Sequence, residues 1–231
     1  MKKMLILLSS LFATCLVHAQ GEVWFNNFNT LYTKISVNQT PGGAATSLMT
    51  GPAGAFDFAF YYTVTANTVL GSADPVIPRA DGELGNYVVN DPNWKYVTTY
   101  GNAAQPGRLQ VTSPDTIPDV PAGGYANFVV FGWSADLGSD PETALFNAQF
   151  GNFSDASVIG ESAVAGTFQL GNDLNYFIPR VFGNIPPSIH GFTLGEIAFV
   201  PEPTSWALAA TVALLWLVGR FRKSPPSLQK V

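Results

Sequence analysis

The sequence is poor in cysteine and histidine, and these two shortages exclude several kinds of site. Cys15 is the only cysteine among 231 residues, and it lies in an N-terminal segment that we expect to be removed. The mature chain then has no disulfide, no thiolate nucleophile and no cysteine-ligated metal. His190 is the one histidine beyond that segment, so we exclude a histidine cluster and interpret His190 as a loop or strand-edge side chain. Such a domain is stabilised by its apolar core alone, for which about 180 residues suffice.

Charged residues are also scarce, and basic ones most of all. They make up 12% of the chain, and the formal net charge is −5. Residues 20–203 contain five basic and sixteen acidic side chains, which gives this part a net charge of −11. Proteins that bind nucleic acids or anionic lipids need a basic surface to contact phosphate groups. The composition therefore argues against a nucleic-acid partner and favours an acidic, soluble domain.

The N-terminus has the pattern of a secretory signal peptide. Lys2 and Lys3 precede an apolar stretch, residues 4–17, and the sequence Val17-His18-Ala19 ends it with residues that a signal peptidase accepts. We predict that residues 1–19 are a signal peptide, cleaved between Ala19 and Gln20, with the Sec machinery and signal peptidase as partners. A buried N-terminal helix is the alternative interpretation.

The C-terminal region combines a proline motif, an apolar run and a basic cluster. The motif is Val200-Pro201-Glu202-Pro203, the apolar run spans residues 206–219, and the cluster is Arg220, Arg222 and Lys223. Residues 204–221 would form a helix of about 27 Å at 1.5 Å per residue, close to the thickness of a hydrocarbon core. We predict a transmembrane helix over 204–221, a cytoplasmic tail over 224–231 and residues 20–199 outside the cytoplasm, because basic residues stay inside.

The two prolines also give the motif an extended backbone, which is the conformation that a protease groove accepts. The order of motif, apolar helix and basic stop resembles the PEP-CTERM sorting signal of proteins from Verrucomicrobia and related Gram-negative bacteria. This resemblance implies that an exosortase, a membrane peptidase, recognises Pro201, Glu202 and Pro203 and processes the chain there. Thr204-Ser205 stands where Ser-Thr is usual. A Pro-rich linker before a simple single-pass anchor remains the rival interpretation.

Residues 20–199 have the composition and alternation of an all-β domain. Phe56, Phe58, Phe60, Tyr62 and Val64 alternate with more polar residues, which predicts a strand with one buried face. Residues 128–131 are continuously apolar, which predicts a central strand with both faces covered. The strands that we predict are residues 22–28, 31–37, 56–65, 86–89, 94–100, 108–112, 125–133, one or two within 158–170, and 192–200.

One short helix interrupts these strands. Asp140 is a natural N-cap, Pro141 suits the first helical position and Glu142 favours the N-terminal dipole, so we predict a helix over 141–148. Residues 113–124 contain three prolines and are predicted to be an irregular connection. The whole pattern favours an antiparallel β-sandwich, Greek-key or jelly-roll-like. Residues 21–28, 49–54, 131–144, 150–154 and 191–194 also resemble segments of PEP-CTERM proteins, a likeness that supports architecture and location.

Few residues of this domain suggest chemistry. Asp136, Asp140 and Glu142 are candidate Ca²⁺ ligands, because they offer oxygen atoms from a Gly/Ser loop. Trp94 and Tyr96 would share one strand face and, with Tyr61, could stack on sugar rings. No Gly-x-Ser-x-Gly context or paired carboxylates are recognisable, so we expect no enzyme and no cofactor.

We therefore expect an exported cell-surface or extracellular-matrix protein with a structural or adhesive ectodomain. The inner-membrane form with a single span would be an intermediate on the way to the cell surface or the exterior. The alternatives are a surface module that binds extracellular polysaccharide or, less favoured, a secreted hydrolase, either of them held by a simple anchor.

Overall fold

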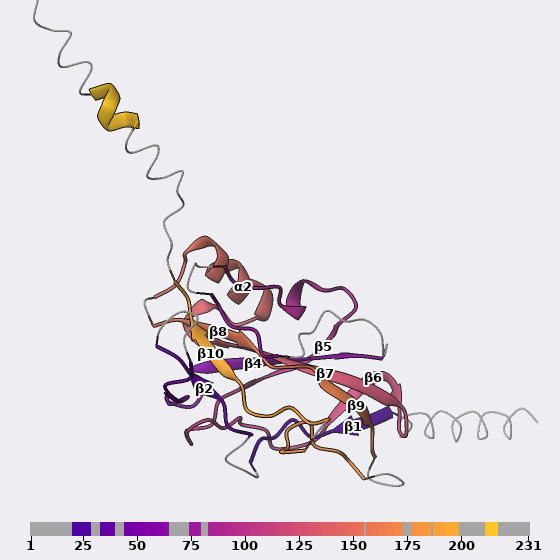
Figure 1. The fold of residues 1–231 in the computed structure, drawn as a ribbon. Helices are drawn as coiled ribbons and strands as arrows, with labels where there is room; N and C mark the ends of the chain where they lie inside the picture. The colour runs from indigo at the N-terminus through magenta and orange to yellow at the C-terminus, as the bar shows by residue number, and fades with distance from the viewer. Residues whose placement is uncertain are drawn as a thin grey trace, which may run out of the picture. The chain divides into compact units, whose positions relative to one another are not determined.

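The computed structural model describes residues 20–28, 33–39, 44–64, 74–79, 83–154, 156–172, 177–185, 187–198 and 211–216 (Figure 1). The chain divides into two units, residues 1–198 and residues 199–231. In the second unit the described part is one helical segment, residues 211–216, whose side chains are exposed. The predicted signal peptide and most of the predicted membrane helix lie outside the described residues.

The first unit is mainly β, as predicted, with short helices. The strands are β1 (Gln20–Val23), β2 (Ser36–Val37), β3 (Ser47–Leu48), β4 (Phe56–Thr63), β5 (Lys95–Gly101), β6 (Asp115–Pro121), β7 (Tyr125–Ser134), β8 (Val158–Glu161), β9 (Ala165–Gln169) and β10 (Thr193–Glu196). The helices are the 3₁₀ turns η2 (Val88–Asn90) and η3 (Ala135–Leu137) and the α-helix α2 (Pro141–Phe150).

These strands form a large sheet of eight strands and a small sheet of two. The large sheet has the order β3-β2-β10-β8-β7-β4-β5, with β9 also paired to β7, and the small sheet joins β1 to β6. Among the described strands the pairs are antiparallel except β10–β2, which is parallel. The large sheet is therefore mixed, and the prediction of purely antiparallel pairing is wrong at this one seam, where two segments far apart in the chain meet.

Strand β7 is the centre of the large sheet. It pairs with β4 along one edge and with β8 and β9 along the other. Between β8 and β9 the ladder is continued by Ser162, whose Oγ accepts the N–H of Val130 at 3.0 Å while its own N–H donates to the Val130 carbonyl at 2.9 Å. The prediction of a central strand covered on both faces is confirmed.

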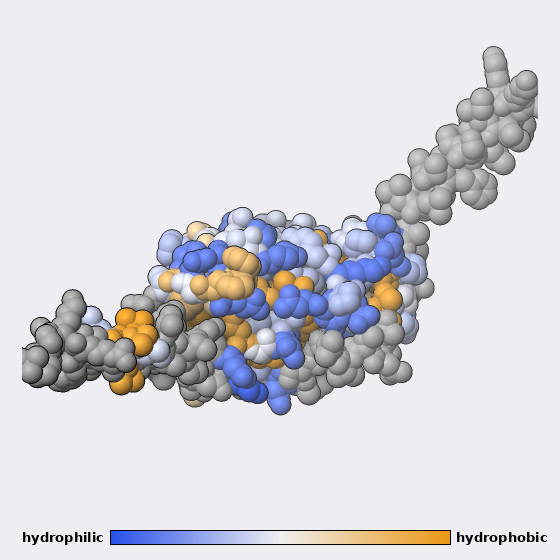
Figure 2. Space-filling model, turned by 90° about the horizontal axis from the view of Figure 1, so that it is seen from above, coloured by the Kyte–Doolittle hydropathy of each residue, from blue (hydrophilic) through white to orange (hydrophobic). Residues whose placement is uncertain are grey.

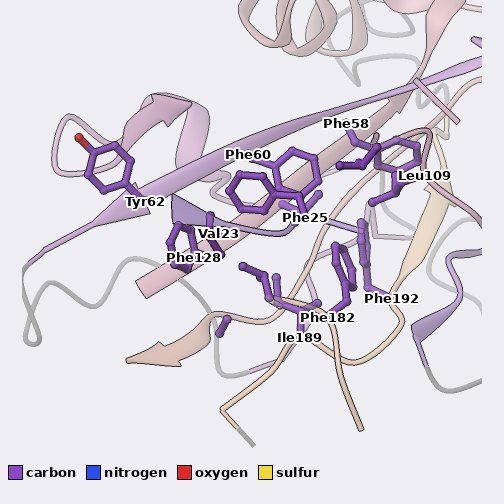
Figure 3. Packing of buried hydrophobic residues seen from close by; sticks show 14 of the residues in the cluster. Val23, Phe25, Phe58, Phe60, Tyr62, Leu109, Phe128, Phe182, Ile189 and Phe192 are labelled. Atoms are coloured by element: carbon purple, nitrogen blue, oxygen red, sulfur yellow. The ribbon is translucent and has the colours of Figure 1, made fainter. Parts of the chain in front are cut away.

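The first core lies between the large sheet and the small sheet (Figure 3). Phe25 packs against Phe60 with ring centroids 4.2 Å apart and against the edge of Phe128 at 5.6 Å. Each such buried phenylalanine contributes about 2 kcal/mol through the apolar surface that it removes from water. Other members of this core include Val23, Phe58, Leu109, Ile117, Phe182, Ile189 and Phe192.

The second core lies on the opposite face of the large sheet, beneath α2, η2 and η3. Ala59 and Tyr61 of β4 belong to it, together with Phe131 and Trp133 of β7. Tyr61 is 3% exposed, so the prediction that β4 has only one buried face is wrong. Alternate side chains of β4 therefore lie in two different cores, rather than in one core and in solvent. The reason is that helices cover the second face of the sheet, which we had expected to be exposed.

Helix α2 confirms its predicted start and extends two residues past the predicted end. The Asp140 carboxylate accepts the N–H of Thr143 at 2.8 Å, and Pro141 occupies the first turn. The helix ends where Gly151 adopts the left-handed conformation, with φ at 76°, a position that glycine fills without strain. Its buried face is Pro141, Ala144, Leu145 and Ala148.

Several predicted local structures differ from the fold. Residues 108–112, predicted as a strand, contain only the isolated bridge of Leu109 to Asn102. The predicted strands 22–28 and 31–37 overlap β1 and β2 by two residues each. Residues 86–89, predicted as a strand, lead into the 3₁₀ turn η2. Residues 113–124, predicted as irregular, contain β6, which pairs with β1. Both strands of a two-stranded sheet are edges, so Pro118 and Pro121 cost β6 few ladder hydrogen bonds.

Within the described residues, no helix combines the length and the hydrophobicity that crossing a bilayer requires.

Candidate functional site

The residues of the predicted sorting signal lie outside the described part of the chain. These are Val200, Pro201, Glu202, Pro203, Arg220, Arg222 and Lys223, and Ala19 of the predicted cleavage site lies outside it as well. Gln20, the residue after that cleavage site, is the first residue of β1 and pairs with Pro121.

The three candidate Ca²⁺ ligands have other roles in the fold. Asp136 accepts hydrogen bonds from the hydroxyls of Ser154 and Ser157. Burial alone would raise the pKa of Asp136, but these and further hydrogen bonds hold it below its usual range. Asp140 caps α2, and Glu142 lies exposed in the first turn. Among the residues that the structure describes, no three acidic or histidine side chains converge as a metal site would require.

Of the three aromatic candidates, the structure brings Tyr61 and Tyr96 into contact, and two of the three are buried. Trp94 and Tyr61 belong to the second core. Tyr96 is 49% exposed and packs edge-on against Tyr61, with ring centroids 5.9 Å apart. Its hydroxyl lies 3.0 Å from that of Thr99. The exposed ring available for stacking at this place is therefore Tyr96.

A buried acid in the second core was not singled out from the sequence. Glu161, the last residue of β8, is fully buried, and its Oε2 accepts the N–H of Val88 at 2.7 Å. Its Oε1 has no hydrogen-bond partner. Burial raises the pKa of the Glu161 carboxyl to about 8, against a smaller lowering by the Val88 N–H. The carboxyl is therefore mostly protonated at neutral pH.

Two tyrosine hydroxyls near Glu161 are also buried without a hydrogen-bond partner, those of Tyr61 and Tyr87. Burial raises the pKa of both phenols, and the charge of Glu161 adds to the rise in each case. Asp140 and Glu142 contribute further to the raised pKa of Tyr61. These three residues, Glu161, Tyr61 and Tyr87, are called the polar cluster.

The sheet register explains how the cluster assembles. Phe131 of β7 is the partner of Ala59 on one side and of Glu161 on the other. Partners in register share a face of the sheet, so the Glu161 side chain lies on the face of the second core. The sequence signal that could have indicated a buried acid is the single acidic residue at the end of the apolar stretch Val158–Glu161. The local sequence does not predict which face of β8 other elements cover.

A hollow of about 460 Å³ lies between the segment before η2 and the C-terminal half of α2. Its lining includes Arg79, Glu83, Leu84, Asn86, Ala148 and Gln149. Arg79 and Glu83 form an exposed ion pair at 2.9 Å. The described lining contains no nucleophile beside a base, so the hollow does not provide the parts of a hydrolytic site.

The surface above the second core is mixed in character. Figure 2, seen from above, shows apolar side chains in patches between hydrophilic ones. Phe146 and Phe150 of α2 are both exposed, and their rings lie 4.4 Å apart.

In comparisons with known proteins, no family model, no curated protein and no solved structure matches this chain.

Proposed function

We propose that the protein is an exported cell-surface or extracellular-matrix protein that is sorted through its C-terminal region. The single observation that carries the proposal is the sequence pattern of residues 200–223: a Pro-Glu-Pro motif, an apolar segment and a basic stop, in that order. The likeness of this pattern to the PEP-CTERM signal supports an exosortase-type peptidase as the partner. The domain before it is structural or adhesive in this proposal.

The positions of the described strands support a structural domain that is separate from the targeting segments. Among the described residues, the first strand begins at Gln20, and the last strand ends at Glu196, before the motif. Every described strand therefore lies between the two proposed targeting segments. In our proposal the domain is a β-sandwich in the broad sense, because residues of both sheets contribute to the first core.

The alternative, a polysaccharide-binding surface, has narrower support. Aromatic platforms for sugars need exposed rings, and of the three aromatic candidates Tyr96 alone is exposed. A secreted hydrolase has no comparable support among the described residues. We therefore propose a function for the sorting region rather than a polysaccharide-binding or hydrolytic site in the domain.

The proposal predicts cleavage at or near the motif. Mass spectrometry of the mature protein from its native host is expected to find an N-terminus at Gln20 and a C-terminus within or close to residues 200–205. Replacing Glu202 by Gln and both motif prolines by Ala is expected to leave the C-terminal segment attached, because the extended, acidic recognition element is lost.

A matched control replaces Pro225 and Pro226, which lie beyond the basic stop, by Ala. This variant is expected to be processed like the wild type. A native protein that ends at Val231 would contradict processing and leave the simple anchor as the explanation.

A further inference from the structure

Two exposed phenylalanines, Phe146 and Phe150, lie side by side on α2. They are 54% and 65% exposed, and their ring centroids are 4.4 Å apart. Because four positions separate them, they share one face of the helix, opposite to the face that packs on the second core. Among the described residues, no other two exposed aromatic side chains have their rings in contact. Single exposed apolar residues need no explanation, whereas contiguous apolar patches mark contact surfaces.

The charges near this phenylalanine pair do not favour an anionic partner. Glu142 lies one turn before Phe146 and is the only charged side chain of α2. Arg79 and Glu83 line the hollow beside the C-terminal half of α2, and they pair with each other at 2.9 Å. Neither α2 nor the described lining of the hollow therefore offers an unpaired basic group. The pair suits a partner that binds through apolar contact and needs no opposite charge.

The chain leaves the domain on the side of the large sheet that α2 covers. Ile197 belongs to the second core, and its N–H donates to the Ser157 carbonyl at 3.2 Å. The Ser157 hydroxyl lies 3.1 Å from that of Ser154, which comes four positions after Phe150. In Figure 1, β10 likewise ends on the side of α2. The C-terminal region therefore begins near the end of α2 that carries the phenylalanine pair.

The length of chain after this exit point limits which side of the domain can reach a membrane. In the proposed function, on which this inference rests, residues 204–221 anchor the chain in a bilayer. Residues 199–203 then connect the domain to the anchor, and five residues span at most about 18 Å. A folded domain of this length has a radius of gyration of about 16 Å. So short a connection brings the exit side of the domain, and not its far side, to the bilayer surface.

We propose that Phe146 and Phe150 contact the lipid surface while the protein is anchored. Aromatic rings favour the interface between water and hydrocarbon. Two rings bind a bilayer weakly from solution, but a short connection makes the contact intramolecular and gives it a high effective concentration. The contact is apolar, so uncharged phosphatidylcholine suffices as the lipid. It holds the domain in one orientation while residues 201–203 are presented to a membrane peptidase.

Spin labels on the chain from Gln20 to Val231, reconstituted in phosphatidylcholine vesicles, test this contact. This chain has no cysteine, so Gln149→Cys places a single label beside the phenylalanine pair, and Val212→Cys places one in the proposed anchor. We expect both labels to collide with oxygen, which dissolves in lipid, and to be shielded from a water-soluble nickel complex. A label at the exposed Gln110, introduced as Gln110→Cys, is expected to remain accessible to nickel.

Replacing both rings, by Phe146→Gln with Phe150→Gln, removes the apolar contact and keeps residues that form helices well. In this variant the label at position 149 is expected to lose its shielding and to become as accessible to nickel as the label at position 110. The label at position 212 is expected to stay in lipid. Glu142→Gln is the matched control, because it changes an exposed side chain of the same helix, and it should leave all three labels unchanged.

A label at position 149 that nickel reaches, while the label at position 212 is in lipid, would overturn the contact and leave the proposed anchor intact. A label at position 212 that nickel reaches would contradict the anchor, and the contact with it. Shielding of position 149 that survives the double replacement would show that the two rings do not make the contact. Shielding that grows with the ratio of protein to lipid would identify a second copy of the chain as the partner instead.

Discussion

Asn27 connects three backbone segments through one buried side chain. Its Oδ1 accepts the N–H of Leu109 at 3.0 Å, and its Nδ2 donates to the carbonyls of Thr33 and Gly107 at 3.0 and 2.8 Å. Asn27→Ala removes all three hydrogen bonds and leaves the buried Leu109 N–H without its acceptor, whereas the Gly107 carbonyl keeps the N–H of Ile35 at 3.1 Å. We expect the free energy of unfolding, measured by urea titration, to fall by about 3 kcal/mol.

Gln110→Ala is the control for this change. Gln110 is next to Leu109 but exposed, so its replacement should alter stability by less than about 0.5 kcal/mol. An Asn27→Ala variant as stable as the Gln110→Ala variant would show that water replaces the lost bonds.

Single residues also show where sequence reasoning stops. Asp140 was predictable as a cap because capping depends on a few consecutive residues. The role of Glu161 was not, because it depends on Val88, which lies 73 positions away. The exposure of Tyr96 and burial of Tyr61 likewise depend on what covers the sheet, which no alternation pattern specifies.

At the scale of elements, the predicted N-terminal cap of α2 can be tested by mutation. The Thr143 N–H in the first turn of α2 donates to the Asp140 side chain. Asp140→Ala is expected to reduce stability by about 1 kcal/mol in the same urea titration. Asp140→Ser keeps a capping oxygen and should recover most of the loss; equal losses in both variants would contradict a capping role.

The strands divide into those that sequence predicts and those that it does not. β4 and β7 are long and strongly patterned, and their positions were predicted within about two residues, the usual uncertainty of boundaries. β6 was missed because prolines mark irregular chain unless the strand is an edge. β2 and β3 have two residues each. They form only by pairing with neighbouring strands, so the local sequence pattern cannot predict their bounds.

At the scale of the whole molecule, residues 20–198 contain every described strand and both cores. We therefore expect this fragment to fold alone, with a single cooperative thermal transition by circular dichroism. The transition should have the same midpoint as that of the mature protein that retains its C-terminal region.

A fragment of residues 20–191 is the comparison, because it lacks β10. β2 and β8 then lose their shared neighbour, and we expect the cooperative transition to disappear. If 20–198 were unfolded while the longer chain folds, the C-terminal region would be part of the domain.

The parallel seam between β2 and β10 has a consequence for the order of events during synthesis. Asn38 belongs to the same seam: its N–H donates to the Leu194 carbonyl, and its Oδ1 accepts the N–H of Glu196, 158 positions along the chain. Closing so long a loop is entropically unfavourable, and such distant pairing slows folding. A chain that leaves the ribosome N-terminus first cannot complete its sheet until nearly all of the domain has emerged. On the export route that we propose, this delay would keep the chain unfolded while it passes the translocation pore, and β10, the last described strand, would complete the sheet after crossing.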